Sequence, residues 1–167
     1  MIKKIKKTGF TLVELLVVIA IIGILTIVSL SSFTSANIKA RDAQRKADLD
    51  ALSKALMMYY NDNGSFPDQS VINNLWGNVE VGFTGPNAIV YIRKMPKDYK
   101  STTFFNYVYK TDFAKKYFNI FANLENRNDD QCKKDPNTGV GIYDVLGSKY
   151  CYGISSPNEI VKTTWLE

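Results

Sequence analysis

An uninterrupted apolar segment near the N-terminus constrains this chain more than any other feature. Residues 10–30 carry one charge, that of Glu14. A helix that rises about 1.5 Å per residue would make the segment about 31 Å long, which matches the hydrocarbon core of a bilayer. Lysines just before the segment predict a cytoplasmic N-terminal edge and a remainder that crosses the membrane. They are Lys3, Lys4, Lys6 and Lys7.

Three kinds of segment share this pattern. A secretory signal needs a small-residue cleavage site after the apolar run, and the serine-rich residues 29–35 contain no clear A-x-A pattern. A plain signal anchor explains the length and the charge. It leaves Glu14 unexplained, because a carboxylate in an apolar span is costly unless it lies near the headgroups. The third kind, a segment that is trimmed and kept, depends on the residues where the lysines meet the apolar run.

Those boundary residues read Lys-Thr-Gly over residues 7–9 and Phe-Thr-Leu-Val-Glu over residues 10–14. This boundary resembles the processing site of prepilins. It shares with that site a short basic leader, a Gly before the cleaved bond, a Phe after the bond, and a Glu as the fifth residue of the mature chain. Prepilins are the precursors of type IV pilins and of type II secretion pseudopilins. The resemblance implies cleavage between Gly9 and Phe10 by a prepilin peptidase, N-methylation of Phe10 and retention of the apolar helix.

The composition argues against catalysis and against a general attraction to nucleic acid. The formal charge of the 167-residue chain is +5, but loss of residues 1–9 removes four lysines and no acid and leaves +1. The mature chain therefore offers no charge-based argument for binding nucleic acid. The chain lacks histidine, GxxxxGK and GxSxG patterns, so we expect neither an enzyme nor catalytic residues.

The helical pattern continues beyond the apolar segment. No proline interrupts residues 10–63, which predicts one helix of about 54 residues that stops where Gly64 and Pro67 follow. In the second half, apolar residues form one stripe, and most basic residues are expected to lie away from it. The stripe comprises Ile38, Leu49, Leu52, Leu56, Tyr59 and Tyr60, and the basic residues are Lys39, Arg45, Lys46 and Lys54.

The remaining residues predict a small head with an antiparallel sheet. The aromatic and β-branched run 104–109 and the alternating run 118–124 suit two strands, with residues 111–116 as the hairpin connection. A third strand is expected around residues 149–154. Three further segments are expected to form a short helix, a short strand and a tail that packs on the head, at 71–76, 79–83 and 160–166.

Together these predictions give an α+β chain with a long N-terminal helix, and the resemblance implies the type IV pilin fold. The expected parts are the removed leader 1–9, the apolar half-helix 10–37, the amphipathic half-helix 38–63 and the head 64–167. By resemblance, the first half forms a filament core and the second packs on the head. Gly23 either loosens the first half, at about 1 kcal/mol relative to Ala, or permits close helix packing.

Two segments of the head extend the resemblance. Residues 57–67, where a tyrosine-bearing helix end runs into Gly-Ser-Phe-Pro, resemble pilins and major pseudopilins. Residues 91–98 resemble the K-x-P-x-D segment that precedes the first sheet strand in major pseudopilins, although Tyr99 replaces a frequent second proline.

The two cysteines, Cys132 and Cys151, bound a loop that is rich in turn residues. A head outside the cytoplasm predicts a disulfide between them, which would stabilise the fold by about 3 kcal/mol. Two buried free thiols are the alternative. We expect no cofactor, although loop oxygens offer a possible Ca²⁺ site with no EF-hand spacing. The candidate oxygens belong to Asp129, Asp130, Asp135, Asn137 and Asp144.

The resemblance implies a structural subunit that assembles into a helical filament of identical copies. Its expected partners are the prepilin peptidase and an inner-membrane assembly platform with its ATPase. The expected location is a plasma-membrane precursor pool, followed by an extracellular filament. In the filament, Glu14 would pair with the Phe10 amine of a neighbouring subunit. The alternatives are a type II secretion pseudopilin and a DNA-binding competence pilin whose surface would include Lys110, Lys115 and Lys116.

We predict that replacing Gly9 with a bulky residue, for example Gly9→Leu, blocks removal of the leader, because the peptidase site reads a small residue before the cut. The intact mass of the cellular protein measures the outcome, since the precursor keeps nine additional residues. A product of mature length from this variant would contradict the cleavage site.

Overall fold

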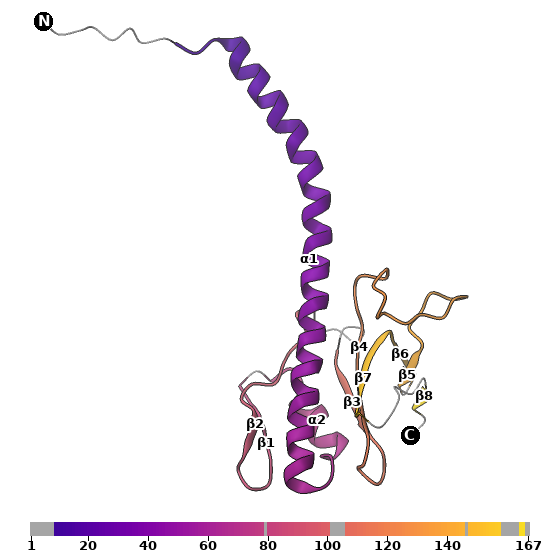
Figure 1. Ribbon diagram of the computed structural model, residues 1–167. Coiled ribbons are helices and arrows are strands. Elements are labelled where there is room, and N and C mark those ends of the chain that lie inside the picture. The colour runs from indigo at the N-terminus through magenta and orange to yellow at the C-terminus, as the bar shows by residue number, and fades with distance from the viewer. Residues whose placement is uncertain (1–8, 79, 101–105, 146, 158–163, 166–167) are drawn as a thin grey trace, which may run out of the picture. The chain divides into compact units, whose positions relative to one another are not determined.

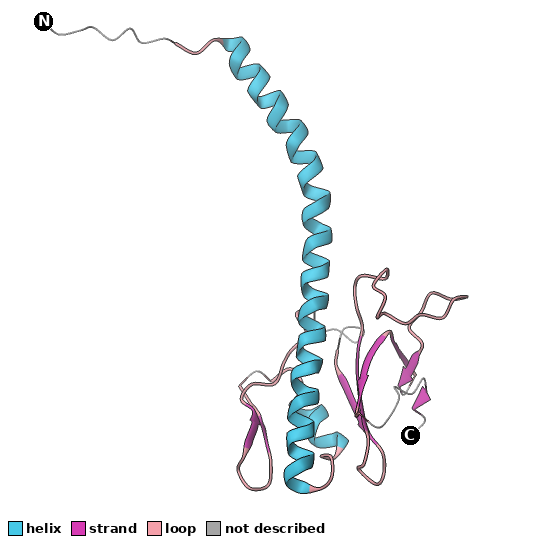
Figure 2. Ribbon diagram, in the orientation of Figure 1, coloured by secondary structure: helices cyan, strands magenta, loops and turns pink. Residues whose placement is uncertain are grey.

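The first element of the computed structural model is a 52-residue helix, α1 (Leu12–Asn63) (Figures 1 and 2). The structure describes residues 9–78, 80–100, 106–145, 147–157 and 164–165, and it does not describe the side chains of residues 27–32 and 164–165. The predicted leader lies outside the described residues except for Gly9. The chain divides into two compact units, Met1–Ile38 and Lys39–Glu167, and α1 contributes to both.

Helix α1 ends where the sequence predicts. Gly64 follows it with a φ of 71°, and its N–H donates to the Tyr60 carbonyl oxygen over 2.8 Å. Glycine reaches this left-handed conformation without strain, so it suits the first position after a helix. A short second helix, α2 (Gln69–Leu75), confirms the helix expected near residues 71–76, and the Asp68 carboxylate caps it by accepting the Ser70 N–H.

The strands of the head that the structure describes form three small sheets (Figure 2). The central sheet has the antiparallel order β3-β4-β7, with strands Val108–Thr111, Phe118–Ala122 and Tyr152–Ser155. The second sheet has the order β6-β5-β8, with strands Ser148–Tyr150, Tyr143–Val145 and Thr164–Trp165. Strands β1 (Phe83–Thr84) and β2 (Val90–Ile92) form a separate antiparallel pair. The predicted α+β class is confirmed, and the arrangement is consistent with the pilin fold.

The central sheet is buried on both faces, because alternate residues of β4 pack into different clusters. Phe118 and Ile120 join the main core with the helix residues Leu49, Leu52 and Leu56, all of them fully buried. The residue after Ile120, Phe121, packs on the opposite face with Tyr143, Val145 and Tyr150 of the second sheet. The second half of α1 therefore covers one face of the central sheet, and β5 and β6 cover part of the other.

Three strand predictions need correction or fall outside the described residues. The single strand expected at 149–154 is two strands, β6 and β7, which separate at Cys151 and join different sheets. The 79–83 strand is reduced to Phe83 at the start of β1. Residues 79, 101–105 and 158–163 lie outside the described residues, so the beginnings of the strand at 104–109 and of the tail stay predictions.

The outer face of the central sheet holds two buried polar side chains from neighbouring strands. Lys110 on β3 and Asn119 on β4 are register partners, with exposed fractions of 3% and 0%. The Asn119 amide has no hydrogen-bond partner, and no ion pair of Lys110 is found among the described residues. Burial lowers the pKa of Lys110, as expected for an ammonium group without a nearby counter-ion.

We predict that Lys110→Met stabilises the head by about 1 kcal/mol, because the thioether keeps the length of the side chain and removes a buried charge. Thermal unfolding followed by tryptophan fluorescence measures the change. Lys54→Met, at an exposed position on α1, is the matched control and should leave the stability nearly unchanged. A destabilised Lys110→Met variant would mean that the ammonium group has a favourable partner.

Candidate functional site

The N-terminal part of α1 presents an exposed apolar surface in the part of the chain that the structure describes. Every side chain from Gly9 to Thr26 is exposed, and most of them are large and apolar. Monomeric proteins seldom expose a continuous apolar area of this extent, which typically marks contact with a membrane or another protein. Over the residues that the structure describes, no helix combines the length and hydropathy needed to cross a membrane, so the span predicted within residues 10–37 is not confirmed.

Glu14, the single acid of this surface, caps its own helix. Its carboxylate accepts the Thr11 N–H over 2.8 Å and the Thr11 hydroxyl over 2.7 Å, while the Glu14 N–H donates to that hydroxyl over 3.2 Å. This reciprocal arrangement is a capping box, which satisfies backbone donors that a helix start leaves free. It holds the carboxylate at the end of the helix that is adjacent in sequence to Phe10.

Two glycines of the predicted site lie in open surroundings. A Cβ atom added to Gly9 or to Gly23 would have no neighbour within 4 Å. Gly23 lies inside α1, where the nearby Thr26 hydroxyl donates to the Ile22 carbonyl oxygen over 2.7 Å. Cleavage after Gly9, methylation of Phe10 and flexibility at Gly23 all stay predictions.

A buried ion cluster in the head is centred on Arg45 of α1. The Arg45 side chain, 2% exposed, donates through Nε and Nη2 to both carboxylate oxygens of Asp98, over 2.5 and 3.0 Å. Its Nη1 lies 2.7 Å from Asp42 and 2.9 Å from Glu125. Burial alone would lower the pKa of Arg45, but the hydrogen bonds to Asp98 and Asp42 outweigh it and raise that pKa above its ordinary value.

Glu125 completes the cluster from the chain that follows β4. Arg41 donates to both of its carboxylate oxygens over 2.8 Å, and the Lys100 ammonium lies 2.8 Å away. The hydrogen bond from Arg41 is the main reason that the pKa of Glu125 lies well below its ordinary value. Three cations and three carboxylates therefore balance one another where α1, residues 98–100 and residues 124–126 meet.

Comparison with known families identifies the N-terminal segment. Residues 4–30 match a family model described as the prokaryotic N-terminal methylation motif. The chain carries a prepilin signal. This is the signal of type IV pilins and pseudopilins, as the boundary residues predicted. Comparisons of the chain with curated proteins and with solved structures found no significant match.

This signal is typical of pilin-like and pseudopilin proteins. It covers the apolar half of α1, and the ion cluster lies in the half that belongs to the head. The sequence predicted the apolar half of α1 but not the ion cluster, because Arg45 was expected to lie away from the apolar stripe. That expectation is wrong. Arg45 precedes Leu49 by four residues and Leu52 by seven, so helical spacing places it on the stripe.

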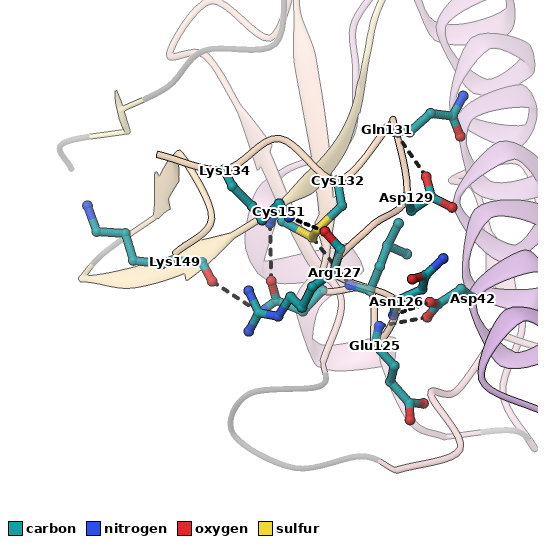
Figure 3. The surroundings of a disulfide bond; sticks show 12 residues. Asp42, Glu125, Asn126, Arg127, Asp129, Gln131, Cys132, Lys134, Lys149 and Cys151 are labelled. Carbon is teal, nitrogen blue, oxygen red and sulfur yellow. Dashed lines mark hydrogen bonds between the residues drawn. A yellow bond between two sulfur atoms is a disulfide. The ribbon is translucent and has the colours of Figure 1, made fainter. Parts of the chain in front are cut away.

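The predicted disulfide between Cys132 and Cys151 is confirmed, and both residues are buried (Figure 3). It fixes the loop after β4 to the point where β6 and β7 separate, and the Lys133 N–H donates to the Cys151 carbonyl oxygen over 2.6 Å. On the α1 side of this loop, the Asp42 carboxylate accepts the N–H groups of Glu125 and Asn126, over 2.8 and 2.7 Å (Figure 3).

Three of the five loop side chains considered for calcium have protein partners. Asp129 pairs with Lys46 and Asp144 with Lys149, each over 2.8 Å, and Asp135 accepts the N–H groups of Asn137 and Thr138. Among the described residues, no group of three or more His, Cys, Asp or Glu side chains is arranged to hold a metal ion. The calcium hypothesis stays a prediction without ligands.

We predict that Glu125→Gln lowers the free energy of unfolding by about 3 kcal/mol at pH 7, because it leaves buried cations without their counter-charge. Since the folded pKa of Glu125 is lowered, its stabilisation is present above its unfolded pKa of about 4.3 and declines as the pH falls further. The difference between wild type and variant should therefore shrink below pH 4.3.

Denaturant unfolding of the chain at a series of pH values measures this difference. Glu80→Gln is the matched control, because Glu80 is exposed and belongs to no ion pair found among the described residues. Equal stability of wild type and Glu125→Gln at pH 7 would contradict a role of the cluster in stability.

Proposed function

We propose that this protein is the major subunit of a type IV pilus or a related extracellular filament. The observation that carries the proposal is the prepilin signal over residues 4–30, which coincides with the exposed apolar surface of α1. A surface of this kind is stable only in lipid or against other apolar chains. A filament built on it satisfies that requirement by placing identical helices together.

The proposed mechanism has three steps. The peptidase removes the leader and frees the α-amine of Phe10, which is then methylated. The apolar half-helix keeps the subunit in the plasma membrane, with its head outside the cytoplasm. An assembly platform driven by an ATPase then transfers the helix into the filament, where apolar surface leaves lipid and meets other subunits.

Glu14 supplies specificity in this scheme. An unpaired carboxylate in an apolar filament core would be expensive. The Phe10 amine of a neighbouring subunit would compensate it and would fix the axial register of the two helices. The capping box supports this role, because it already holds the carboxylate at the helix end next to Phe10.

A type II secretion pseudopilin is the alternative. In its favour, the segment at residues 91–98, which resembles major pseudopilins, supplies the Asp98 carboxylate to the ion cluster. The disulfide favours a pilin. Long filaments on cells that express the protein at its native level support a pilin, whereas secretion defects without such filaments support a pseudopilin.

The lysines considered for a competence pilin form no exposed basic surface. Lys110 is buried, Lys115 lies 3.4 Å from Asp68, and Lys116 donates to the Gly64 carbonyl oxygen. These contacts tie the β3–β4 hairpin to the end of α1. They give no support to DNA binding at this hairpin.

We predict that Glu14→Val inserts into the membrane as wild type does but assembles few filaments, because the neighbouring amine loses its counter-charge. Shearing of cells, followed by immunoblotting of the sheared and membrane fractions, measures assembly and insertion separately. Glu14→Asp, which keeps the charge, is the control and should assemble better than Glu14→Val. Wild-type filament yield from Glu14→Val would defeat the pairing.

A further inference from the structure

The turn between β3 and β4 presents a phenylalanine that the head leaves uncovered. Phe113 has a relative exposure of 106%, so its ring lies wholly in solvent. Single exposed apolar side chains are common on protein surfaces and need no function. Phe113 suggests a contact only because of two further observations, which are the order of its turn and a hollow elsewhere on the head.

The turn that carries Phe113 is held by its own hydrogen bonds. The Asp112 carboxylate accepts three backbone N–H groups, from Ala114 over 3.2 Å and from Lys116 and Tyr117 over 2.7 Å each. The Asp112 N–H also donates to the Tyr117 carbonyl oxygen over 3.3 Å. One side chain therefore fixes the backbone on both sides of Phe113.

The same turn is fastened to the end of α1. The Lys115 carbonyl oxygen accepts the Phe66 N–H over 2.9 Å, and the Lys116 ammonium donates to the Gly64 carbonyl oxygen over 3.2 Å. A side chain on a backbone that is already ordered loses less conformational entropy when it binds than one on a loose loop. Phe113 is thus placed as an anchor for another molecule.

A hollow with aromatic walls lies at the other end of β3. Its volume is about 330 Å³, and its walls include Trp76, Pro96, Lys97 and Tyr107. The Trp76 and Tyr107 rings meet edge to face, with centroids 5.1 Å apart. Aromatic rings favour edge-to-face and offset contacts with one another, so these walls suit a further ring.

Phe113 is too far from this hollow to fill it within one head. Tyr107 directly precedes β3 and Phe113 follows its end, and a strand of four residues is about 13 Å long. A ring and a hollow at different places on one chain are the two halves of a head-to-tail contact between copies. Such a contact, when repeated, builds a helical filament.

The direction of β3 agrees with the direction of assembly. Tyr109 of β3 shares the main core with Leu52 of α1, and the strand runs roughly along the second half of that helix (Figure 1). Copies displaced along their α1 helices would therefore also be displaced along β3. That displacement moves the Phe113 end of one head toward the hollow of another.

We propose that Phe113 of one copy inserts into the hollow between Trp76 and Tyr107 of the next copy. The contact rests on the proposed function, because it joins heads within the filament. A second copy accounts for both the uncovered ring and the aromatic hollow, whereas an unrelated partner would account for only one of them.

Cysteine cross-linking in sheared filaments tests which residues meet. Chains with Ala114→Cys, beside Phe113, are co-expressed with chains with Lys97→Cys, at the wall of the hollow, and the filaments are treated with a short bismaleimide. Cross-linked dimers should form only when both variants are present. In the matched control, Lys54→Cys at an exposed position on α1 replaces Lys97→Cys and should give no dimer.

The outcomes separate this contact from the filament itself. Filaments that contain both variants but no dimer, or as much dimer with Lys54→Cys as with Lys97→Cys, would exclude the contact and leave the proposed function intact. Absence of filaments from the wild-type chain would reject the proposed function and the contact together.

Filament yield gives a second test. Phe113→Ser should lower the yield about tenfold, as expected for loss of a buried aromatic anchor, and Phe113→Leu should restore part of it. Val140→Ser, at an exposed apolar residue of the disulfide loop, is the control and should assemble as wild type does. Circular dichroism of the mature variants in detergent confirms folding. A wild-type yield from Phe113→Ser would overturn the proposal.

Discussion

The buried ion cluster around Arg45 is the interaction on which the arrangement of the head depends. It joins three segments that are distant in sequence: α1, the stretch at Asp98 and the stretch at Glu125. Hydrophobic burial of Leu49, Leu52 and Leu56 supplies a non-directional attraction between helix and sheet, which permits more than one rotation of the helix. Charged hydrogen bonds of fixed geometry remove that freedom, because a rotated helix would leave Arg45 buried without its carboxylates. The disulfide adds a second constraint by holding the loop that presents Glu125 and Asn126 to Asp42.

The two halves of α1 therefore differ in their surroundings. Its second half is completed by the head, through the apolar stripe and the ion cluster. The described side chains of its first half, from Leu12 to Thr26, are exposed, and the prepilin signal covers the same residues. In the filament that we propose, subunits would associate through the first half.

The sequence predicted the parts whose signal is local and periodic. The length and end of α1, the β3–β4 hairpin and the prepilin boundary all follow from hydrophobic spacing, turn residues and a short motif. The parts that it missed depend on contacts between distant segments. Arg45 resembles a solvated helix residue until Asp98 and Glu125 are brought to it, and the two strands that separate at Cys151 resemble one run until different partners divide them. The Thr11–Glu14 capping box is the exception, because its four-residue signal was present in the sequence.

The central claim is that the leader is removed, whereas the apolar half of α1 is kept and used for assembly. Mass spectrometry of the N-terminal peptide of the protein in sheared extracellular filaments tests it most directly. The account predicts a peptide that begins at Phe10 and is heavier by one methyl group, with the apolar residues intact. A protein that begins downstream of residue 30, or one that retains Met1 in the filament, would contradict it.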